Sequence, residues 1–188
     1  MIIKSMHRPE LQKLVDNWKK LSDEMSSIQT LCRDVTRPKA ADYDTIPRDV
    51  YEKVINAEGW TAIDDTDENW WNFPLFTYGE ATPAAAKVAP YTVDLLNEIG
   101  GVHFAGFSLL LAGGVLSGHT DKPACKKPVG KLTYHLGLSC PDDCYLIQGD
   151  KANKEEDGKL FSFKCDKRHL AVNLSNSTRV ILYMTFTK

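Results

Sequence analysis

The chain has 188 residues, of which 43% are hydrophobic and 26% are charged, a composition that belongs to one soluble globular domain and not to a disordered segment. Its 23 Lys and Arg residues against 25 Asp and Glu residues give a net charge of -2, which excludes a broad basic surface for nucleic acid or an anionic membrane. The most apolar segment, Phe104 to Leu116, is interrupted by glycines and is shorter than the roughly 20 residues of a membrane-spanning helix, so we expect no nucleic-acid partner and no membrane span.

The first half of the chain is predicted to be mainly helical. Apolar residues at spacings of three and four predict an amphipathic helix from about Glu10 to Leu31. A loop over Arg37 to Ile46 is expected to lead into a short helix from Pro47 to Ala57, because proline favours the first turn of a helix. A further helix is expected from Thr82 to Ile99.

Two tryptophan-containing segments, Trp60 to Ile63 and Trp70 to Tyr78, flank an acidic run over Asp64 to Asn69. Four acidic residues so close together are compatible with calcium binding. The run lacks the glycine and the terminal glutamate of a calcium loop, however, so a solvated hairpin turn is favoured.

The second half of the chain is predicted to be a β domain. From Val102 onward, short β-type runs alternate with Gly, Pro, Asn and Asp. The predicted strands cover Phe104 to Leu111, Gly130 to Ser139, Cys144 to Gln148, Lys159 to Phe163, His169 to Leu174 and Arg179 to Thr187. Helices followed by antiparallel strands indicate an α+β fold in which the helices pack outside a sandwich or barrel.

No internal repeat, low-complexity tract or linker divides the sequence. We therefore expect one domain over residues 1–188, with a helical part to about residue 101 and a β-barrel core from about 102 to 188.

The cysteines favour a reducing setting. There are five, an odd number, and none forms a C-x-x-C pair of the kind that holds structural zinc. Cys140 and Cys144 are expected to be free thiols in a turn at the end of a strand. The first residues lack the apolar stretch of a secretory signal, so we expect the protein to be cytoplasmic.

The segment Gly118-His119-Thr120-Asp121 carries the first candidate chemistry. Side chains two residues apart on extended backbone point to the same side, so His119 and Asp121 can bind one metal ion. A histidine from a distant strand would complete the two-histidine, one-carboxylate set that binds Fe(II), and His169 is the candidate. Taken alone, an H-x-D sequence is more often a pair of polar surface residues.

The C-terminal segment places an arginine close to the last of these histidines. With a hairpin tip at Asn176, Asn173 would face Arg179 and His169 would face Tyr183. Arg179 would then lie on the same face as His169. An inward guanidinium needs an anionic partner, which is either a structural carboxylate or the carboxylate of a bound acid.

The strand from Lys131 to Leu138 alternates in polarity and places Thr133, His135 and Gly137 on one face. A histidine beside small residues suits the lining of a cavity. A histidine that is hydrogen-bonded inside an ordinary core is an equally good interpretation of this segment.

Taken in order, these segments resemble the aspartyl/asparaginyl β-hydroxylase family of 2-oxoglutarate- and Fe(II)-dependent oxygenases. The resemblance is carried by Ser108, His119-Thr-Asp121, Lys131 to Leu138, Gly158 to Phe163, His169 and Arg179, and by the N-terminal segments Leu14 to Lys20 and Trp71 to Gly79. It implies a double-stranded β-helix (jelly roll), with the N-terminal helices packed on the outside.

The resemblance also implies roles for individual residues. His119 and His169 would bind the metal, and Arg179 would hold the distal carboxylate of 2-oxoglutarate with help from His135 and Ser108. No other catalytic residue is implied.

Two positions depart from the animal aspartyl hydroxylase of this family. Asp121 stands where that enzyme has glycine, so the chain has a full set of three ligands, which argues against a halogenase because halide would need the position of the carboxylate. Thr133 stands where that enzyme has an arginine for the acidic side chain of its substrate. Thr133 and Lys131 are therefore the substrate-binding candidates, with Lys126 and Lys127 as other sources of positive charge.

The implied function is hydroxylation of a C–H bond of an amino-acid residue, in a peptide, a protein or a free amino acid. Fe(II), 2-oxoglutarate and O2 would be needed, and succinate and CO2 would be released. The alternatives are an oxygenase acting on another small molecule, a non-catalytic barrel that holds Zn(II) or Ni(II), and a β-sandwich in which His119, Asp121 and His169 lie apart.

Overall fold

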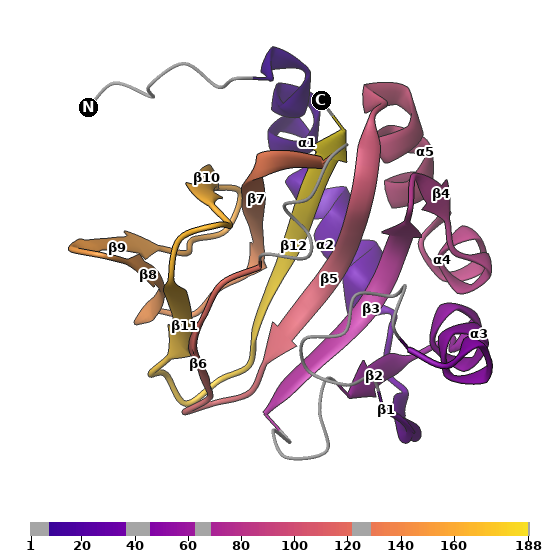
Figure 1. The fold of residues 1–188 in the computed structure, drawn as a ribbon, viewed down its shortest axis with the longest axis horizontal. Coiled ribbons are helices and arrows are strands. Elements are labelled where there is room, and N and C mark those ends of the chain that lie inside the picture. The colour runs from indigo at the N-terminus through magenta and orange to yellow at the C-terminus, as the bar shows by residue number, and fades with distance from the viewer. Residues whose placement is uncertain (1–7, 37–45, 63–68, 122–128, 188) are drawn as a thin grey trace.

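Two β-sheets face each other, and helices cover the outer side of the larger sheet (Figure 1). The computed structural model describes residues 8–36, 46–62, 69–121 and 129–187, and for Thr36 and residues 129–131 only the backbone. The elements of the N-terminal half are η1 (Pro9–Leu11), α1 (Gln12–Asp16), α2 (Trp18–Ser26), β1 (Leu31–Thr36), α3 (Arg48–Asn56), β2 (Trp60–Ala62), β3 (Trp70–Thr77), β4 (Glu80–Ala81), α4 (Pro83–Val88) and α5 (Pro90–Ile99). Those of the C-terminal half are β5 (Val102–Leu110), β6 (Val115–His119), β7 (Val129–Ser139), β8 (Cys144–Gln148), β9 (Lys151–Lys154), β10 (Leu160–Lys164), β11 (His169–Asn173) and β12 (Arg179–Thr187).

The order of the strands identifies the fold. The larger sheet runs β1-β2-β3-β5-β12-β7-β10, with β4 added to β3, and the smaller sheet runs β6-β11-β8-β9. From β5 onward the chain passes back and forth between the two sheets, and every pairing among β5 to β12 is antiparallel. This is a double-stranded β-helix, so the expected α+β fold class is confirmed.

The hairpin expected around Asn176 is wrong. Strand β11 belongs to the smaller sheet, where His169 is paired with His119, and β12 belongs to the larger sheet, where Tyr183 is paired with His135. The polar segment between these two strands is therefore a crossover between sheets.

Asn173 explains why the chain crosses at this point. Its buried side chain donates from Nδ2 to the carbonyl oxygen of Leu110 at 3.0 Å and to that of Ser177 at 2.8 Å, while Ser175 donates to its Oδ1 at 2.7 Å. These bonds hold the segment between β11 and β12 against the end of β5. Arg179 is consequently paired with Leu110 of β5, and the expected pairing of Arg179 with Asn173 does not form.

The helical half differs from the expectation in three places. The first predicted helix is interrupted at Asn17 and ends at Ser26, so that Leu31 already begins a strand. The helix expected over 82–99 is divided at Pro90, because proline lacks an N–H and disfavours helical backbone in the residue before it. This half also contributes β1 to β4 to the larger sheet, so it is not purely helical.

Most of the apolar core lies between the helices and the outer face of the larger sheet. The residues that share this position include Leu11, Leu14, Leu21, Leu136 and Leu138. The interior between the two sheets holds a much smaller apolar cluster, formed by Leu116, Leu146, Phe163 and Ala171. The apolar side chains buried between the helices and the larger sheet therefore stabilise the fold, and most of the space between the two sheets is available for polar side chains.

The described cysteines agree in part with the expectation. Cys140 and Cys144 are free thiols, as is Cys32, whereas Cys165 is disulfide-bonded to a partner that is not among the described residues. No helix in the described parts of the chain is long and apolar enough to cross a membrane. Location in the cell stays a prediction.

Candidate metal centre

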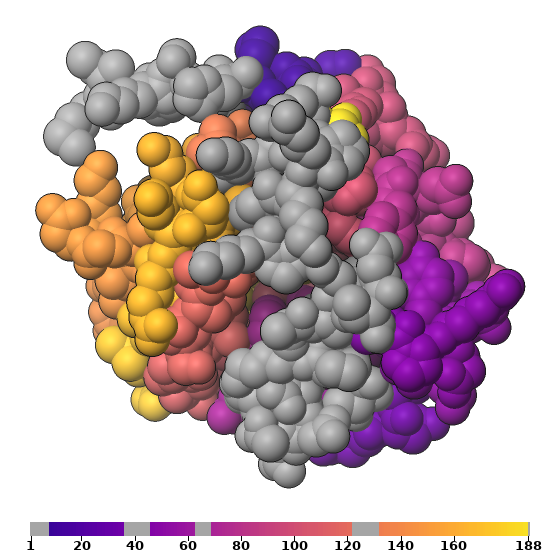
Figure 2. Space-filling model, in the orientation of Figure 1, coloured from indigo at the N-terminus to yellow at the C-terminus, as the bar shows by residue number. Residues whose placement is uncertain are grey.

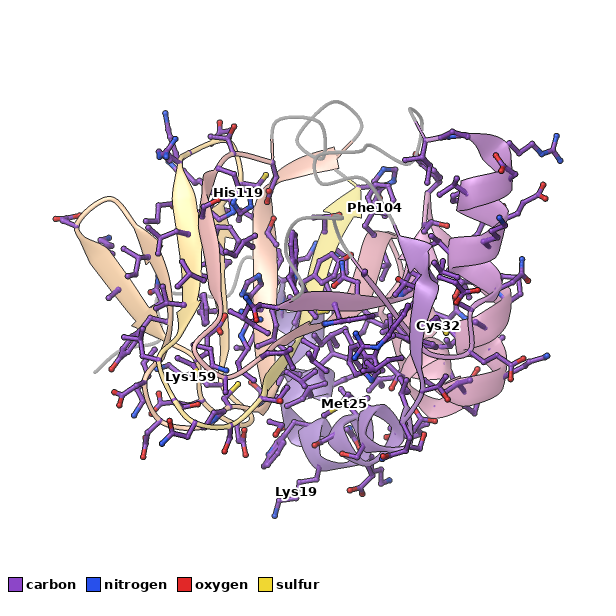
Figure 3. The ribbon with its side chains drawn as sticks, turned by 90° about the horizontal axis from the view of Figure 1, so that it is seen from below. Lys19, Met25, Cys32, Phe104, His119 and Lys159 are labelled. Atoms are coloured by element: carbon purple, nitrogen blue, oxygen red, sulfur yellow. The ribbon has the colours of Figure 1, made fainter. Side chains whose placement is uncertain are left out.

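Three potential metal ligands converge where β6 ends and β11 begins. His119 is the last residue of β6, His169 is the first residue of β11, and the two are direct partners across the pair of strands. The two strands lie side by side at the surface (Figure 2), and His119 lies near one end of its strand (Figure 3). Asp121 follows two residues after β6, and one ligand atom from each of the three side chains lies within 4.8 Å of the others. The alternative in which these residues lie apart is therefore excluded.

Backbone hydrogen bonds orient both imidazole rings. Nδ1 of His119 lies 2.8 Å from the carbonyl oxygen of Ser117, and Nδ1 of His169 lies 2.9 Å from that of Lys167. A carbonyl only accepts, so Nδ1 of each ring carries the proton, and Nε2 of each neutral ring carries the lone pair with which an imidazole binds a metal ion. Both Nε2 atoms face the Asp121 carboxylate, at 3.3 Å for His119 and 3.6 Å for His169. Histidine ligands of metal ions are held in this way.

The environment keeps His169 neutral. Burial lowers the pKa of His169, although the charge of Asp121 opposes this effect. A neutral imidazole is the form that binds a metal ion. His119 and Asp121 are about one-third and one-quarter exposed, so the group is open on one side.

A buried ion pair lies deeper in the barrel. Nη2 of Arg179 donates to Oε1 of Glu155 at 2.9 Å, and Nε donates to Oε2 of the same carboxylate. His135 bonds to the same residue, with Nδ1 2.9 Å from Oε1. The side chains of Arg179 and Glu155 are 3% and 0% exposed, so the anionic partner predicted for Arg179 is a structural carboxylate.

Gly137 allows Glu155 to reach this position. The segment after β9 crosses directly over Gly137, which donates its N–H to the carbonyl oxygen of Lys159 and accepts from the N–H of Gly158. A Cβ atom at position 137 would lie 2.0 Å from the carbonyl oxygen of Glu156. Only glycine fits under this crossing.

Glu155, Arg179 and His135 interact electrostatically, and these interactions shift the pKa values of Glu155 and His135. Burial alone would raise the pKa of Glu155, but the charge of Arg179 and the hydrogen bond with His135 outweigh burial and lower it to about 2. Burial lowers the pKa of His135, and Glu155 opposes that shift. At neutral pH the cluster therefore holds an ionised carboxylate, a guanidinium and a neutral imidazole.

Phe163 joins the deeper cluster to the metal-ligand group. Its ring centroid lies 4.7 Å from that of His169 and 4.9 Å from that of His135. The two polar groups are therefore separated by a single aromatic ring, and a ligand that spans both would cross this ring.

The other predicted site residues lie on the same inner face. Thr133 is paired with Phe163, and its buried Oγ1 has no hydrogen-bond partner among the described residues. Ser108 is buried in β5, where its Oγ accepts from Nε1 of Trp70 at 2.9 Å. The side chain of Lys131 lies outside the described residues.

Lys126 and Lys127 also lie outside the described residues. Glu155 is the one member of the inner cluster that the sequence did not point to. It stands in a polar run over Asp150 to Asp157, which looks like a solvated loop.

Comparisons with known proteins give the following matches. The sequence model of a family described as aspartyl/asparaginyl β-hydroxylase matches residues 15–188. A curated relative, an ornithine lipid ester-linked acyl 2-hydroxylase of Rhizobium tropici, is 32% identical over 127 residues, which are 65% of this chain and 43% of the relative. The chain thus aligns with less than half of the length of that relative.

Two solved structures are similar at low identity. One is a 2OG-Fe(II) oxygenase family oxidoreductase from Burkholderia pseudomallei, with a TM-score of 0.46 and 12% identity over 64% of this chain and 69% of that one. The other is a Cupin_2 domain of an XRE family transcriptional regulator from Enterobacter cloacae, with a TM-score of 0.43 and 13% identity over 64% of this chain and 99% of that one. Neither likeness bears on substrate or chemistry.

Proposed function

Because this chain belongs to the aspartyl/asparaginyl β-hydroxylase family, we propose that it is a 2-oxoglutarate- and Fe(II)-dependent oxygenase that hydroxylates a C–H bond. Succinate and CO2 would be the co-products. The observation that carries this proposal is the convergence of His119, Asp121 and His169, with both Nε2 atoms directed at the carboxylate.

The donor set fits a ferrous ion. Two neutral imidazoles and one carboxylate form the facial set that holds Fe(II) and leaves positions open for other ligands. Bound iron would supply the oxidising chemistry that the protein's own side chains lack, with O2 as the oxidant and 2-oxoglutarate as the cosubstrate that is oxidised to succinate and CO2. His119, Asp121 and His169 would hold the ion, and the carbonyl oxygens of Ser117 and Lys167 would keep the two rings in the ligating tautomer.

Arg179 and His135 suit the far carboxylate of 2-oxoglutarate. Glu155 occupies the Nε edge of the guanidinium, and Nη1 makes no hydrogen bond to any residue that the structure describes. The edge formed by the two terminal nitrogens therefore suits a bidentate pair with a carboxylate. Ser108 lies one strand away on the same inner face, since its partner Ile181 is two residues from Arg179.

Phe163 supplies an apolar surface between the metal-ligand group and Arg179. Together with Leu116 and Leu146 it would exclude water from a bound cosubstrate. Excluding water strengthens the charge pairs at both ends of the site.

For the substrate we favour a chain with a neutral carbonyl group, such as an acyl ester. A threonine hydroxyl donates to an ester or amide carbonyl but cannot neutralise a carboxylate, and Thr133 has a buried hydroxyl without a partner among the described residues. Phe104, Thr185, Thr133 and Phe163 form one row of partners across β5, β12, β7 and β10. Three strand spacings make this row about 14 Å long, enough for an acyl chain.

The outer end of that row is apolar. Phe104 packs against the apolar cluster of Ile46 and Val54, as Val50 and Tyr51 of α3 also do. It lies at the same end of the two sheets as His119 (Figure 3). The curated relative acts on the ester-linked acyl chain of a lipid, which agrees with this proposal.

An amino-acid residue, in a peptide or free, is the second candidate substrate and is favoured by the family to which the chain belongs. The test incubates iron-loaded protein with 2-oxoglutarate and a panel of acyl esters, peptides and amino acids. Succinate release coupled to a mass gain of one oxygen in an acyl ester supports the favoured class, and the same gain in a peptide supports the second. A bound divalent ion with no turnover on any member of the panel favours a non-catalytic barrel.

A further inference from the structure

Glu155 occupies one edge of the guanidinium that would bind the cosubstrate. Its two carboxylate oxygens accept from Nε and Nη2 of Arg179, and Oε1 also bonds to Nδ1 of His135 at 2.9 Å. A guanidinium has a second edge, formed by its two terminal nitrogens. Nη1 on that edge has no hydrogen bond to the described residues.

The backbone around Glu155 is fixed at several points. The N–H of Glu155 donates to the carbonyl oxygen of Cys144 at 2.9 Å, and Oδ1 of Asp157 accepts from the N–H of Cys140 at 2.7 Å. The crossing over Gly137 leaves no room for the segment to move inward. The carboxylate is therefore a permanent part of the site and cannot act as a mobile cap.

The charge of Glu155 offsets that of Arg179. Among the described residues, the titratable groups that interact with this pair are His135, which burial keeps neutral, and the thiols of Cys140 and Cys144. Burial raises the pKa of these thiols to about 12 and about 11, so they carry no charge at neutral pH. The pair is thus close to neutral overall. A carboxylate that binds to the free edge of Arg179 would gain its hydrogen bonds but would also be repelled by Glu155.

We propose that Glu155 is a positioning residue that holds Arg179 for end-on binding of a dicarboxylate and weakens that binding through its own negative charge. This inference rests on the proposed function. Succinate has the same far carboxylate as 2-oxoglutarate, so the repulsion weakens the hold on the product as well. Glu155 therefore favours release of succinate after each turnover.

The test measures succinate binding to metal-free protein by calorimetry, which isolates the Arg179 end of the site from the metal and from catalysis. We expect the Glu155→Gln variant to bind succinate at least about tenfold more tightly than the unaltered protein, because the amide keeps the shape and removes the repelling charge. The matched control is Glu156→Gln, which changes the exposed neighbouring carboxylate and should leave the affinity unchanged. Arg179→Gln should abolish binding.

Each outcome decides the inference. Equal or weaker binding by Glu155→Gln overturns it, and so does an absence of succinate binding in both proteins. If the unaltered protein converts 2-oxoglutarate to succinate in either of those cases, the proposed function stands and only the role of Glu155 fails. If neither binding nor conversion occurs, the proposed function fails with it.

Glu155→Gln leaves a buried guanidinium without its partner and can prevent folding. A crystal structure of the unaltered protein with succinate then decides. We expect succinate on the edge formed by the two terminal nitrogens of Arg179, with Glu155 still bonded to Nε. Displacement of Glu155 by succinate, or succinate bound elsewhere, would overturn the proposal.

Discussion

His119 and His169 are direct partners across strands β6 and β11, although four strands separate them in the sequence. Their ring centroids lie 4.4 Å apart. Because the side chains of a strand alternate between its faces, a shift of one residue in this register would turn one ring away from the other. The candidate metal centre therefore depends on the pairing of these two strands.

The first prediction concerns metal binding. Replacing His119 or His169 by alanine should lower the affinity for Fe(II) or Co(II) by more than about a hundredfold, since loss of an outer-shell partner alone typically costs 10- to 100-fold. Calorimetry and metal analysis measure this. The control is His103→Ala, because His103 packs with Tyr78 and Phe104 and is not among the converging ligands. An unchanged metal affinity in the His169→Ala variant would contradict the assignment of His169 as a metal ligand.

The second prediction separates folding from cosubstrate binding at Arg179. Arg179→Gln alone leaves Glu155 buried and unpaired, which should lower the free energy of unfolding by roughly 3–5 kcal/mol. Adding Glu155→Gln should restore most of that stability, because both charges are then gone. The double variant should still need roughly 30- to 1,000-fold more 2-oxoglutarate, the equivalent of about 2–4 kcal/mol of lost binding. Urea unfolding and the apparent KM for 2-oxoglutarate give the two quantities. A double variant with a normal KM would contradict the role of Arg179.

The third prediction concerns the crossing over Gly137. Gly137→Ala should lower the free energy of unfolding by about 2–3 kcal/mol or more and weaken 2-oxoglutarate binding, because the added Cβ collides with the backbone that carries Glu155. Gly113→Ala is the control. It meets no atom within 4 Å and has a φ of +70°, so it should cost only roughly 1–2 kcal/mol and leave binding unchanged. Equal losses of stability and of 2-oxoglutarate binding in the two variants would contradict the close backbone crossing over Gly137.

The fourth prediction is a pH dependence of stability. The pKa of Glu155 is about 2 in the folded protein, against 4.5 for an unperturbed glutamate side chain, so its contribution to stability is complete above about pH 4.5 and is lost as the pH falls toward 2. The loss should reach roughly 3 kcal/mol. Urea unfolding between pH 5 and 2 measures this slope, by comparison with Glu155→Gln, in which this component should be absent. Identical slopes in the two proteins would show that Glu155 is not held in its ionised form.

The fifth prediction concerns Thr133. Thr133→Val keeps the shape of the side chain and removes a buried hydroxyl without a described partner, so stability should stay the same or rise by about 1 kcal/mol. The kcat/KM for an acyl ester should nevertheless fall by about fivefold or more, because the hydrogen bond to its carbonyl is lost. The affinity for 2-oxoglutarate should not change. An unchanged kcat/KM would place the substrate carbonyl elsewhere.

Several features of the site could be predicted from the sequence. The alternation around His135 places Thr133 and His135 on one face, and the structure has both on the inner face of β7. The two-residue spacing of His119 and Asp121 indicated that the two side chains bind the same metal ion. The chemistry of the ligand set made His169 the candidate for the third ligand, and the family resemblance supported that choice, because no local pattern links separate strands.

Other features could not be predicted, for physical reasons. A polar turn between two strands looks the same whether it closes a hairpin or crosses between sheets, so the segment around Asn176 was misread. Glu155 is one of several charged residues in a polar run, and its burial depends on Gly137 in a different strand. Strand β6 (Val115–His119) is short, and strand β9 (Lys151–Lys154) is polar, so neither has the pattern of a typical strand.

We propose that His119, Asp121 and His169 hold one ferrous ion and that 2-oxoglutarate binds to this ion. The most direct test adds 2-oxoglutarate to iron-loaded protein without oxygen and follows the visible charge-transfer absorption that the keto acid gives on a ferrous ion. We expect one ion per chain and a new absorption band in the unaltered protein, with neither in His169→Ala. Equal iron content in both proteins, or no band in the unaltered one, would contradict this assignment of the metal site.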